Sequence, residues 1–151
     1  YTLAALAGGF AWCALGVSLA FGWLPDETET RAAYVFCALL GWVTPFILGQ
    51  IHKIIPFLVW LHVYSKAWKP PTPLPKISDL TSEKLAWAEL AAFVPGVYAG
   101  VAGFLLQSYP LLRAGSVLFL AAATLYAVNI AGSLVHVLRK EPRWTPIKTP
   151  P

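Results

Sequence analysis

The stretch GQIHKIIPFLVWLHVYSK, residues 49–66, places two histidines and a lysine inside an apolar and aromatic run. It belongs to a hydrophobic segment from Ala32 to Tyr64, which would measure about 50 Å as one straight helix at about 1.5 Å per residue. The hydrocarbon core of a bilayer is only about 30 Å thick. Pro45 and Pro56 lie in this segment and favour kinks. We therefore expect a membrane helix that is tilted and broken, or one that projects beyond the bilayer.

The composition indicates a polytopic membrane protein. Hydrophobic residues make up 58% of the 151 residues and charged residues only 12%, whereas soluble domains carry about 25% charged residues. So few charges cannot coat a water-soluble surface, and the lipid bilayer is the expected partner. A very apolar soluble subunit buried in a complex is the weaker alternative. The chain starts at Tyr1 and contains no methionine, so we expect it to be part of a longer protein, with a processed chain as the alternative.

Four apolar segments predict four transmembrane helices in a single domain over residues 1–151. They run over residues 3–24, 32–64, 83–106 and 110–138. Each is long enough to cross the hydrocarbon core, and backbone groups that meet no water must be paired within a helix. The fold class is therefore all-α, a bundle of four transmembrane helices. We expect it to belong to a larger helical bundle and to contact other membrane subunits.

The placement of Lys and Arg predicts the orientation. An acidic turn at 24–31 joins the first two spans, a proline-rich segment at 66–82 joins the second and third, and an extended tail follows at 139–151. With four spans, the proline-rich segment and the tail share one side of the membrane. That side holds eight of the eleven Lys and Arg residues, so we expect it in the cytoplasm. These residues anchor the chain to a membrane and form no nucleic-acid stripe.

Glycines mark one side of two predicted spans: Gly96, Gly100 and Gly103 in the third, and Gly8, Gly9 and Gly16 in the first. Such faces let helices approach closely, so we expect them to serve bundle packing. A chromophore or lipid lying flat against the glycines is the alternative.

The second span carries a polar and aromatic stripe of residues spaced 3, 4, 3 and 4 apart: Gln50, Lys53, Phe57, Trp60 and Tyr64. This stripe points to a partner, a cavity or a cofactor. If the span is centred in the bilayer, His52 and Lys53 lie near mid-membrane, where ionisable groups are functional candidates. If the bilayer covers residues 32–52, both lie at the cytoplasmic boundary and Lys53 reaches the headgroups. Glu89, the carboxylate inside the third span, either pairs with a base on another helix or lies in the headgroup zone.

Three histidines are candidate ligands. His52 and His62 are ten residues apart, or about 15 Å of helix rise, so they cannot hold one metal ion or haem iron together. His62 and His136 lie at similar depth near the cytoplasmic ends of the second and fourth spans. Such a pair could bind a b-type haem axially or share a metal ion. Two interfacial histidines with no common ligand are the alternative.

The segment GWVTPFILGQIHKIIPFLVWLHVYS, residues 41–65, and PTPLPKISDL, residues 71–80, resemble the C-terminal part of bacterial membrane proteins similar to the haem–copper oxidase subunit I superfamily. The matching residues are Gly49, Lys53, Ile54, Pro56, Phe57, Trp60 and His62. The resemblance implies a redox-associated, haem-binding protein of the bacterial inner membrane. True oxidase subunits carry a His–x–His on one helix and a His–His pair on another. This chain has neither, so the resemblance does not imply oxygen reduction.

Three functions follow as hypotheses. The first is an integral-membrane subunit of a respiratory or photosynthetic electron-transfer assembly, with haem b held by His62 and His136, or by His52 and a helix outside this chain. The second is a non-catalytic structural subunit that docks on partner proteins or pigments. The third is a fragment of a proton-coupled transporter with His52 and Lys53 as a proton relay. The sequence assigns no catalytic residue and no substrate.

Overall fold

The computed structural model describes residues 1–64 and 76–138, apart from the side chain of His136. Residues 65–75 of the proline-rich connection and the tail at 139–151 lie outside this description. The described residues are helical and contain no β-strand. Their elements, in chain order, are α1 (Thr2–Ala20), α2 (Thr28–Phe36), η1 (Cys37–Val43), α3 (Thr44–Val63), η3 (Ile77–Leu80), α4 (Glu83–Leu105) and α5 (Tyr109–Leu138).

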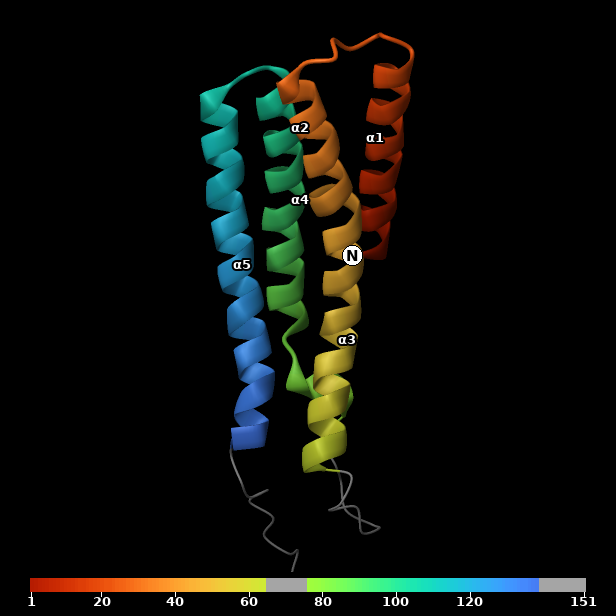
Figure 1. Ribbon diagram of the computed structural model, residues 1–151. Helices are drawn as coiled ribbons and strands as arrows, with labels where there is room; N and C mark the ends of the chain where they lie inside the picture. The colour runs from red at the N-terminus through yellow and green to blue at the C-terminus, as the bar shows by residue number, and fades with distance from the viewer. Residues whose placement is uncertain (65–75, 139–151) are drawn as a thin grey trace, which may run out of the picture.

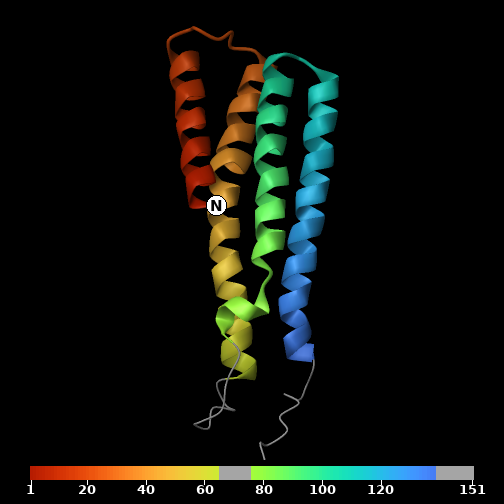
Figure 2. The same ribbon diagram turned by 180° about the vertical axis from the view of Figure 1, so that it is seen from behind.

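Four helices in the described part of the chain are long and apolar enough to cross a membrane. They cover Thr2–Ala20, Thr28–Val63, Glu83–Leu105 and Tyr109–Val135. They run side by side and alternate in direction (Figures 1 and 2). The all-α class and the four predicted spans are therefore confirmed at the level of length and composition.

The first span ends, and the second span begins, at residues other than those that the sequence predicted. α1 ends at Ala20, not at residue 24, and Gly22 then turns the chain with a φ of +70°. The second span begins at Thr28, inside the predicted acidic turn. Glu27 before it is extended, and Glu29 lies in the first helical turn, where a negative charge favours the helix dipole. The acidic turn is therefore shorter than expected.

Proline does not break the second span. α2, η1 and α3 follow one another over 36 residues, about 54 Å of helix, so this helix is longer than a hydrocarbon core of about 30 Å. η1 is a π-helix that ends just before Thr44 and Pro45. The backbone N–H and the hydroxyl of Thr44 both donate to the carbonyl of Leu39, and this wider turn accommodates a proline that has no N–H. The expected break is not observed, and the projection of this helix beyond a bilayer stays a prediction.

The spans differ in length, which leaves one end of the bundle uneven. The α1–α2 connection and the α4–α5 turn lie at the same end (Figure 1). α1 and α4 have 19 and 23 residues, whereas α5 has 30. At the opposite end, α3 and α5 therefore extend past the beginnings of α1 and α4, and η3 lies there (Figure 2).

Glycines bring α4 close to α5. A Cβ on Gly115 of α5 would lie 3.1 Å from the carbonyl oxygen of Gly96 and 3.2 Å from the backbone nitrogen of Gly100. A Cβ on Gly103 would lie 2.8 Å from the side chain of Leu112, closer than real side chains come. Protein atoms therefore fill the glycine side of the third span. This confirms the packing expectation there, and a chromophore or lipid has no flat surface at these glycines.

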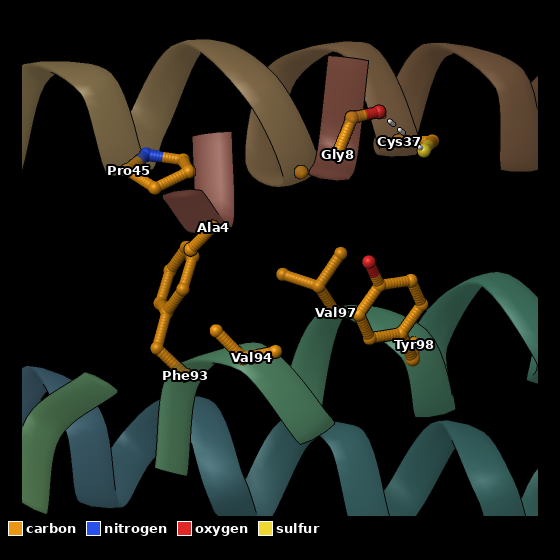
Figure 3. A pocket seen from close by; sticks show the side chains of 9 residues that line it. Ala4, Gly8, Cys37, Pro45, Phe93, Val94, Val97 and Tyr98 are labelled. Atoms are coloured by element: carbon orange, nitrogen blue, oxygen red, sulfur yellow. Dashed lines mark hydrogen bonds between the residues drawn. The ribbon is translucent and has the colours of Figure 1, made fainter. Parts of the chain in front are cut away.

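α1 crosses η1 at a second pair of glycines (Figure 3). A Cβ on Gly8 would overlap the carbonyl group of Gly41, and the thiol of Cys37 lies 3.8 Å from the Gly8 carbonyl oxygen, to which it donates. The cavity beside Pro45 and Phe93 measures only about 10 Å³, which is at most the space of one water molecule. This crossing is a packing contact and not a ligand site.

Candidate functional site

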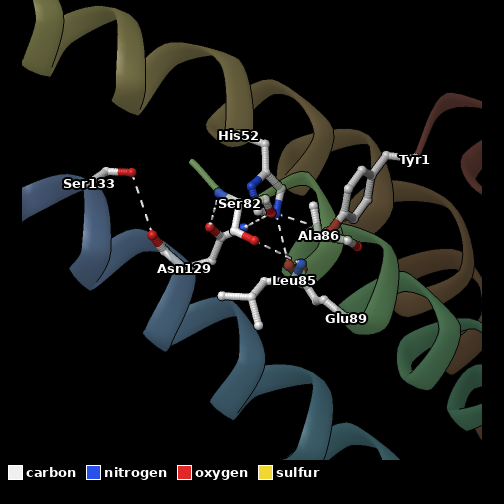
Figure 4. A network of polar contacts seen from close by, with 8 residues as sticks. All are labelled: Tyr1, His52, Ser82, Leu85, Ala86, Glu89, Asn129 and Ser133. Atoms are coloured by element: carbon white, nitrogen blue, oxygen red, sulfur yellow. Dashed lines mark hydrogen bonds and ion pairs between the residues drawn. The ribbon is translucent and has the colours of Figure 1, made fainter. Parts of the chain in front are cut away.

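A histidine from α3 meets a carboxylate from α4 inside the bundle (Figure 4). Nε2 of His52 lies 2.8 Å from Oε2 of Glu89. Only 10% of the His52 side chain and 2% of the Glu89 side chain are exposed. A charge buried to this extent is costly unless it is paired and hydrogen-bonded. Each of these two groups supplies the partner that the other needs.

Two tyrosines adjoin this pair. The hydroxyl of Tyr1, which precedes α1, lies 3.0 Å from Nε2 of His52 and donates to the carbonyl of Ala86 at 3.2 Å. The ring of Tyr126 on α5 meets the His52 imidazole edge-on, with 5.6 Å between the ring centroids. We call Tyr1, His52, Glu89 and Tyr126 the His–Glu cluster. It joins the start of α1 to α3, α4 and α5.

The contacts of the His–Glu cluster allow two proton arrangements. With a proton on Nε2, His52 shares that N–H between Glu89 and the Tyr1 oxygen, while Tyr1 donates to Ala86. With the proton on the carboxyl group, Glu89 donates to Nε2, which then accepts. The His52–Glu89 contact serves both arrangements, whereas Tyr1, while it donates to Ala86, bonds to Nε2 only when that nitrogen carries the proton. The pair can therefore hold a proton on either residue without losing the link between α3 and α4.

The His–Glu cluster lies level with the beginning of α1, because Tyr1 immediately precedes α1 and touches His52. Glu89 is the seventh of the 23 residues of α4, so it lies about 9 Å along a helix of about 35 Å. The cluster is therefore closer to the beginning of α4 than to its end. The depth of His52 and Lys53 in a bilayer stays a prediction from the sequence.

A second set of polar contacts fixes the beginning of α4 against α5. The side chain of Asn129 accepts from the backbone N–H of Ser82 at 2.9 Å and donates to the Ser82 carbonyl at 3.2 Å. The hydroxyl of Ser133 donates to the carbonyl of Leu80 at 2.7 Å. Ser82 also caps α4, because its hydroxyl accepts from the N–H of Leu85 at 3.4 Å. These bonds hold α4 where Glu89 meets His52.

An open groove adjoins His52 from the surface. It lies between α3 and η3, and its lining comprises His52, Lys53, Ile54, Pro56, Phe57, Ile77, Ser78 and Thr81. His52 therefore belongs both to the wall of this groove and to the buried contact with Glu89. Lys53 and Phe57, two members of the predicted stripe, lie at the groove.

Gln50, His62 and Tyr64, which the sequence also singled out, lie apart from the His–Glu cluster, whereas Glu89 belongs to it. Gln50 and His62 are exposed, and Tyr64 is half-buried and takes part in a further contact. Glu89 is buried and pairs with a base on another helix, which was one of its two expected roles. It does not lie free in a headgroup zone.

The described side chains bring no two histidines together. Nε2 of His52 already contacts Glu89 and Tyr1, so it does not fit the role of a free haem ligand. His62 is exposed, and the side chain of His136 lies outside the described residues. Haem ligation by His62 and His136 therefore stays a prediction from the sequence. Among the described residues, no three His, Cys, Asp or Glu side chains group in a way that could hold a metal ion.

Sequence reasoning missed Tyr1, Tyr126, Asn129 and Ser133. A signal exists for three of them, because Tyr126, Asn129 and Ser133 are spaced three and four residues apart and share one face of α5. Polar residues with this spacing in an apolar span indicate a face turned toward other helices. No local pattern marks Tyr1, because its partner His52 is 51 residues away.

Comparisons with protein-family models, with curated proteins and with solved structures found no match for this chain.

Proposed function

We propose that this chain is a proton-handling subunit of a larger integral-membrane assembly of the respiratory or photosynthetic electron-transfer class. The observation that carries the proposal is the buried His52–Glu89 pair in a bundle of helices long and apolar enough to cross a membrane. Ionisable residues in such bundles are expensive, and they mark proton relays and ion pathways by default. An electron that enters a low-dielectric interior adds charge, and a nearby proton site can balance that charge.

The chemistry of the pair suits proton exchange. While one proton is shared between the imidazole and the carboxylate, the pair is neutral overall, either as two opposite charges or as two neutral groups. A second proton leaves one net positive charge, and loss of the shared proton leaves one net negative charge. The Tyr1 hydroxyl lies beside Nε2 of His52 and can donate or accept a hydrogen bond. It can therefore accept from Nε2 when that nitrogen carries a proton and donate to it when the proton has left.

The position of His52 supports a route for the proton. His52 lines the open groove between α3 and η3, whereas the Glu89 side chain is only 2% exposed. A proton that enters from the groove would meet His52 first and pass to Glu89 through the contact of 2.8 Å. His52 is thus the relay of the proposed site, and Glu89 is the buried proton acceptor.

Two alternatives predict different behaviour of the same pair. In a structural subunit, the His52–Glu89 contact only fixes α3 against α4, and the pair keeps one protonation state. In a fragment of a proton-coupled transporter, His52 and Lys53 form the relay. That alternative predicts a pH-dependent proton flux that Lys53→Leu abolishes.

Infrared spectroscopy tests the proposal directly. The chain is reconstituted in lipid vesicles, and its carboxyl and carboxylate bands are recorded across a pH series in H₂O and D₂O. We expect a protonated-carboxyl band that titrates, that is lost in Glu89→Gln and that exchanges with D₂O more slowly in His52→Gln. The control is Glu83→Gln, since Glu83 is exposed on the same helix. A Glu89 band that does not change with pH would overturn the proposal and favour the structural subunit.

The proposal includes the bacterial inner membrane, with residues 66–82 and the C-terminus in the cytoplasm. The excess of Lys and Arg on that side supports this orientation. Single cysteines at Glu27→Cys and Ser78→Cys, in a chain whose native cysteines are replaced, test it with a membrane-impermeant maleimide on intact cells. We expect labelling of Glu27→Cys alone. Labelling of Ser78→Cys on intact cells would show that the orientation is the opposite of the proposed one.

The haem prediction is tested separately. A reduced-minus-oxidised visible spectrum of the purified chain should show haem bands, and these bands should disappear in His62→Ala and in His136→Ala. A flat spectrum would remove haem from the proposal and leave the proton-handling site standing on His52 and Glu89.

A further inference from the structure

We propose that the groove between α3 and η3 binds the phosphate headgroup of an anionic phospholipid. This proposal goes beyond the proton-handling function and does not depend on it, because it rests on the surface of the groove and not on the buried pair. The residues that carry it are Lys53, Phe57, Ile77 and Thr81, with Ile54 beside them.

The groove holds a cation that pairs with no carboxylate in the described part of the chain. Lys53 is exposed at the groove, and among residues 1–64 and 76–138 no carboxylate forms an ion pair with it. Arg31, near the other end of the same long helix, is different, since its guanidinium lies 2.6 Å from the carboxylate of Asp26. The charge of Arg31 is therefore matched by Asp26, whereas none of the described carboxylates matches the charge of Lys53.

The carboxylate of η3 takes part in hydrogen bonds within η3 and its N-cap. Asp79 accepts a hydrogen bond from the backbone N–H of Lys76 at 3.0 Å and another from the hydroxyl of Ser78 at 3.3 Å. These bonds hold the carboxylate at the start of η3. Asp79 is not part of the groove lining, so it leaves the charge of Lys53 available.

The walls of the groove match a ligand that is polar at one end and apolar along its length. Ile54, Phe57 and Ile77 leave 50%, 47% and 38% of their surfaces exposed beside Lys53. Thr81 adds a hydroxyl to the same lining. A lysine with apolar neighbours favours an anion that carries hydrocarbon, because the hydrocarbon then contacts the apolar stem of the lysine and the anion contacts its ammonium group.

The level of the groove identifies the anion as a lipid headgroup. The groove lies just before α4 begins at Glu83, where the charged side chains of Glu83 and Lys84 are exposed, so it lies at the edge of a hydrocarbon layer matched to the 23 residues of α4. Phosphates of phospholipids lie at this depth, and anionic lipids attract basic residues there. A zwitterionic lipid carries its own cation, which would compete with Lys53 for the phosphate. Free phosphate would leave the apolar walls without contact.

Native mass spectrometry tests the proposal with the full chain in detergent and an equimolar mixture of phosphatidylglycerol and phosphatidylcholine. We expect phosphatidylglycerol adducts to exceed phosphatidylcholine adducts several-fold. Lys53→Gln should abolish this preference, whereas Lys84→Gln, which removes an exposed lysine from the first turn of α4, should retain it. Phe57→Ser should weaken the retention of the lipid without removing the preference for the anionic headgroup.

Three results would overturn the proposal. The first is equal retention of the two lipids by the wild-type chain. The second is a preference in Lys53→Gln that equals that of the wild type, in a variant whose helix content and melting temperature show that it folds. The third is displacement of phosphatidylglycerol by millimolar inorganic phosphate, which would identify the ligand as free phosphate. Retention of phosphatidylglycerol in the presence of inorganic phosphate supports the proposal that the groove binds a phospholipid.

Discussion

The imidazole of His52 and the carboxylate of Glu89 are 37 residues apart in the chain and 2.8 Å apart in space. This contact links α3 to α4 at the level where α1 begins, and only 10% of the His52 side chain and 2% of the Glu89 side chain are exposed. Because neither side chain has much contact with water, the bundle must supply their partners.

The first prediction concerns the energetic coupling of this pair. His52→Ala and Glu89→Ala should each lower the free energy of unfolding by about 1–3 kcal/mol, because each leaves a buried polar partner unsatisfied. The double variant should cost less than the sum of the two, with a coupling of about 0.5–3 kcal/mol. Unfolding in mixed detergent micelles measures all four proteins. Strictly additive losses would show that the two residues do not interact.

The second prediction concerns the crossing of α1 and η1. Gly8→Ala places a methyl group against the Gly41 carbonyl, so α1 must shift, and we expect a loss of about 1–3 kcal/mol. Gly132→Ala is the matched control, since a Cβ there meets nothing within 4 Å. Its helix should gain about 0.5–1 kcal/mol from the lower backbone entropy of alanine. The two substitutions therefore differ in sign, and equal effects would contradict the close approach of the helices.

The third prediction concerns the beginning of α4. Asn129→Ala removes the partner of both the N–H and the carbonyl of Ser82. We expect it to lower the free energy of unfolding by about 2 kcal/mol. Ser133→Ala removes one hydrogen bond to Leu80 and should lower it by about 1 kcal/mol. Thr124→Ala is the control, because the hydroxyl of Thr124 is exposed and bonds only within its own helix. Hydrogen exchange should rise at η3 and the first turn of α4 in Asn129→Ala. Unchanged hydrogen exchange at η3 and the first turn of α4 would show that Asn129 does not hold the beginning of α4 in place.

The fourth prediction concerns pH and the α1–α2 connection. The two hydrogen bonds from the Arg31 guanidinium, and then its positive charge, hold the pKa of the Asp26 carboxyl below its ordinary value of 3.8. A carboxyl whose pKa is lower in the folded protein stabilises the fold above its unfolded pKa, and this contribution is lost as the pH falls through the folded pKa. NMR titration of the Asp26 carboxyl carbon in micelles should give a lower midpoint in the wild type than in Arg31→Gln. Because both side chains are largely exposed, added salt should bring the two midpoints together.

The sequence alone predicted the parts of this structure that depend on local composition. Hydrophobicity over about 20 residues is a property of each segment, so the four spans could be found without any knowledge of their neighbours. The length of the second span also followed from residue count. The start of α2 was misplaced because polar residues at 28–31 form helical turns that hydropathy does not detect.

The same reasoning failed where two helices must face each other. The sequence singled out His52, Lys53 and Glu89 as intramembrane polar residues, yet it left Glu89 with two possible roles and did not pair it with His52. Depth along a span follows from counting residues, but the direction that a side chain points follows from helix rotation. Rotation is fixed by contacts such as Gly115 against Gly96 and Asn129 against Ser82.

The sequence by itself therefore determined that this protein consists of four apolar helices, where each lies in the chain, and which polar residues they carry. Only the tertiary structure decided that His52 meets Glu89, that Tyr1 and Tyr126 adjoin them, and that Lys53 lies at an open groove where none of the described carboxylates pairs with it. The physical reason is that hydrophobic burial specifies which segments leave water, and it has no preferred direction. Close glycine contacts and buried hydrogen bonds do have a direction, and they exist only once the helices have packed.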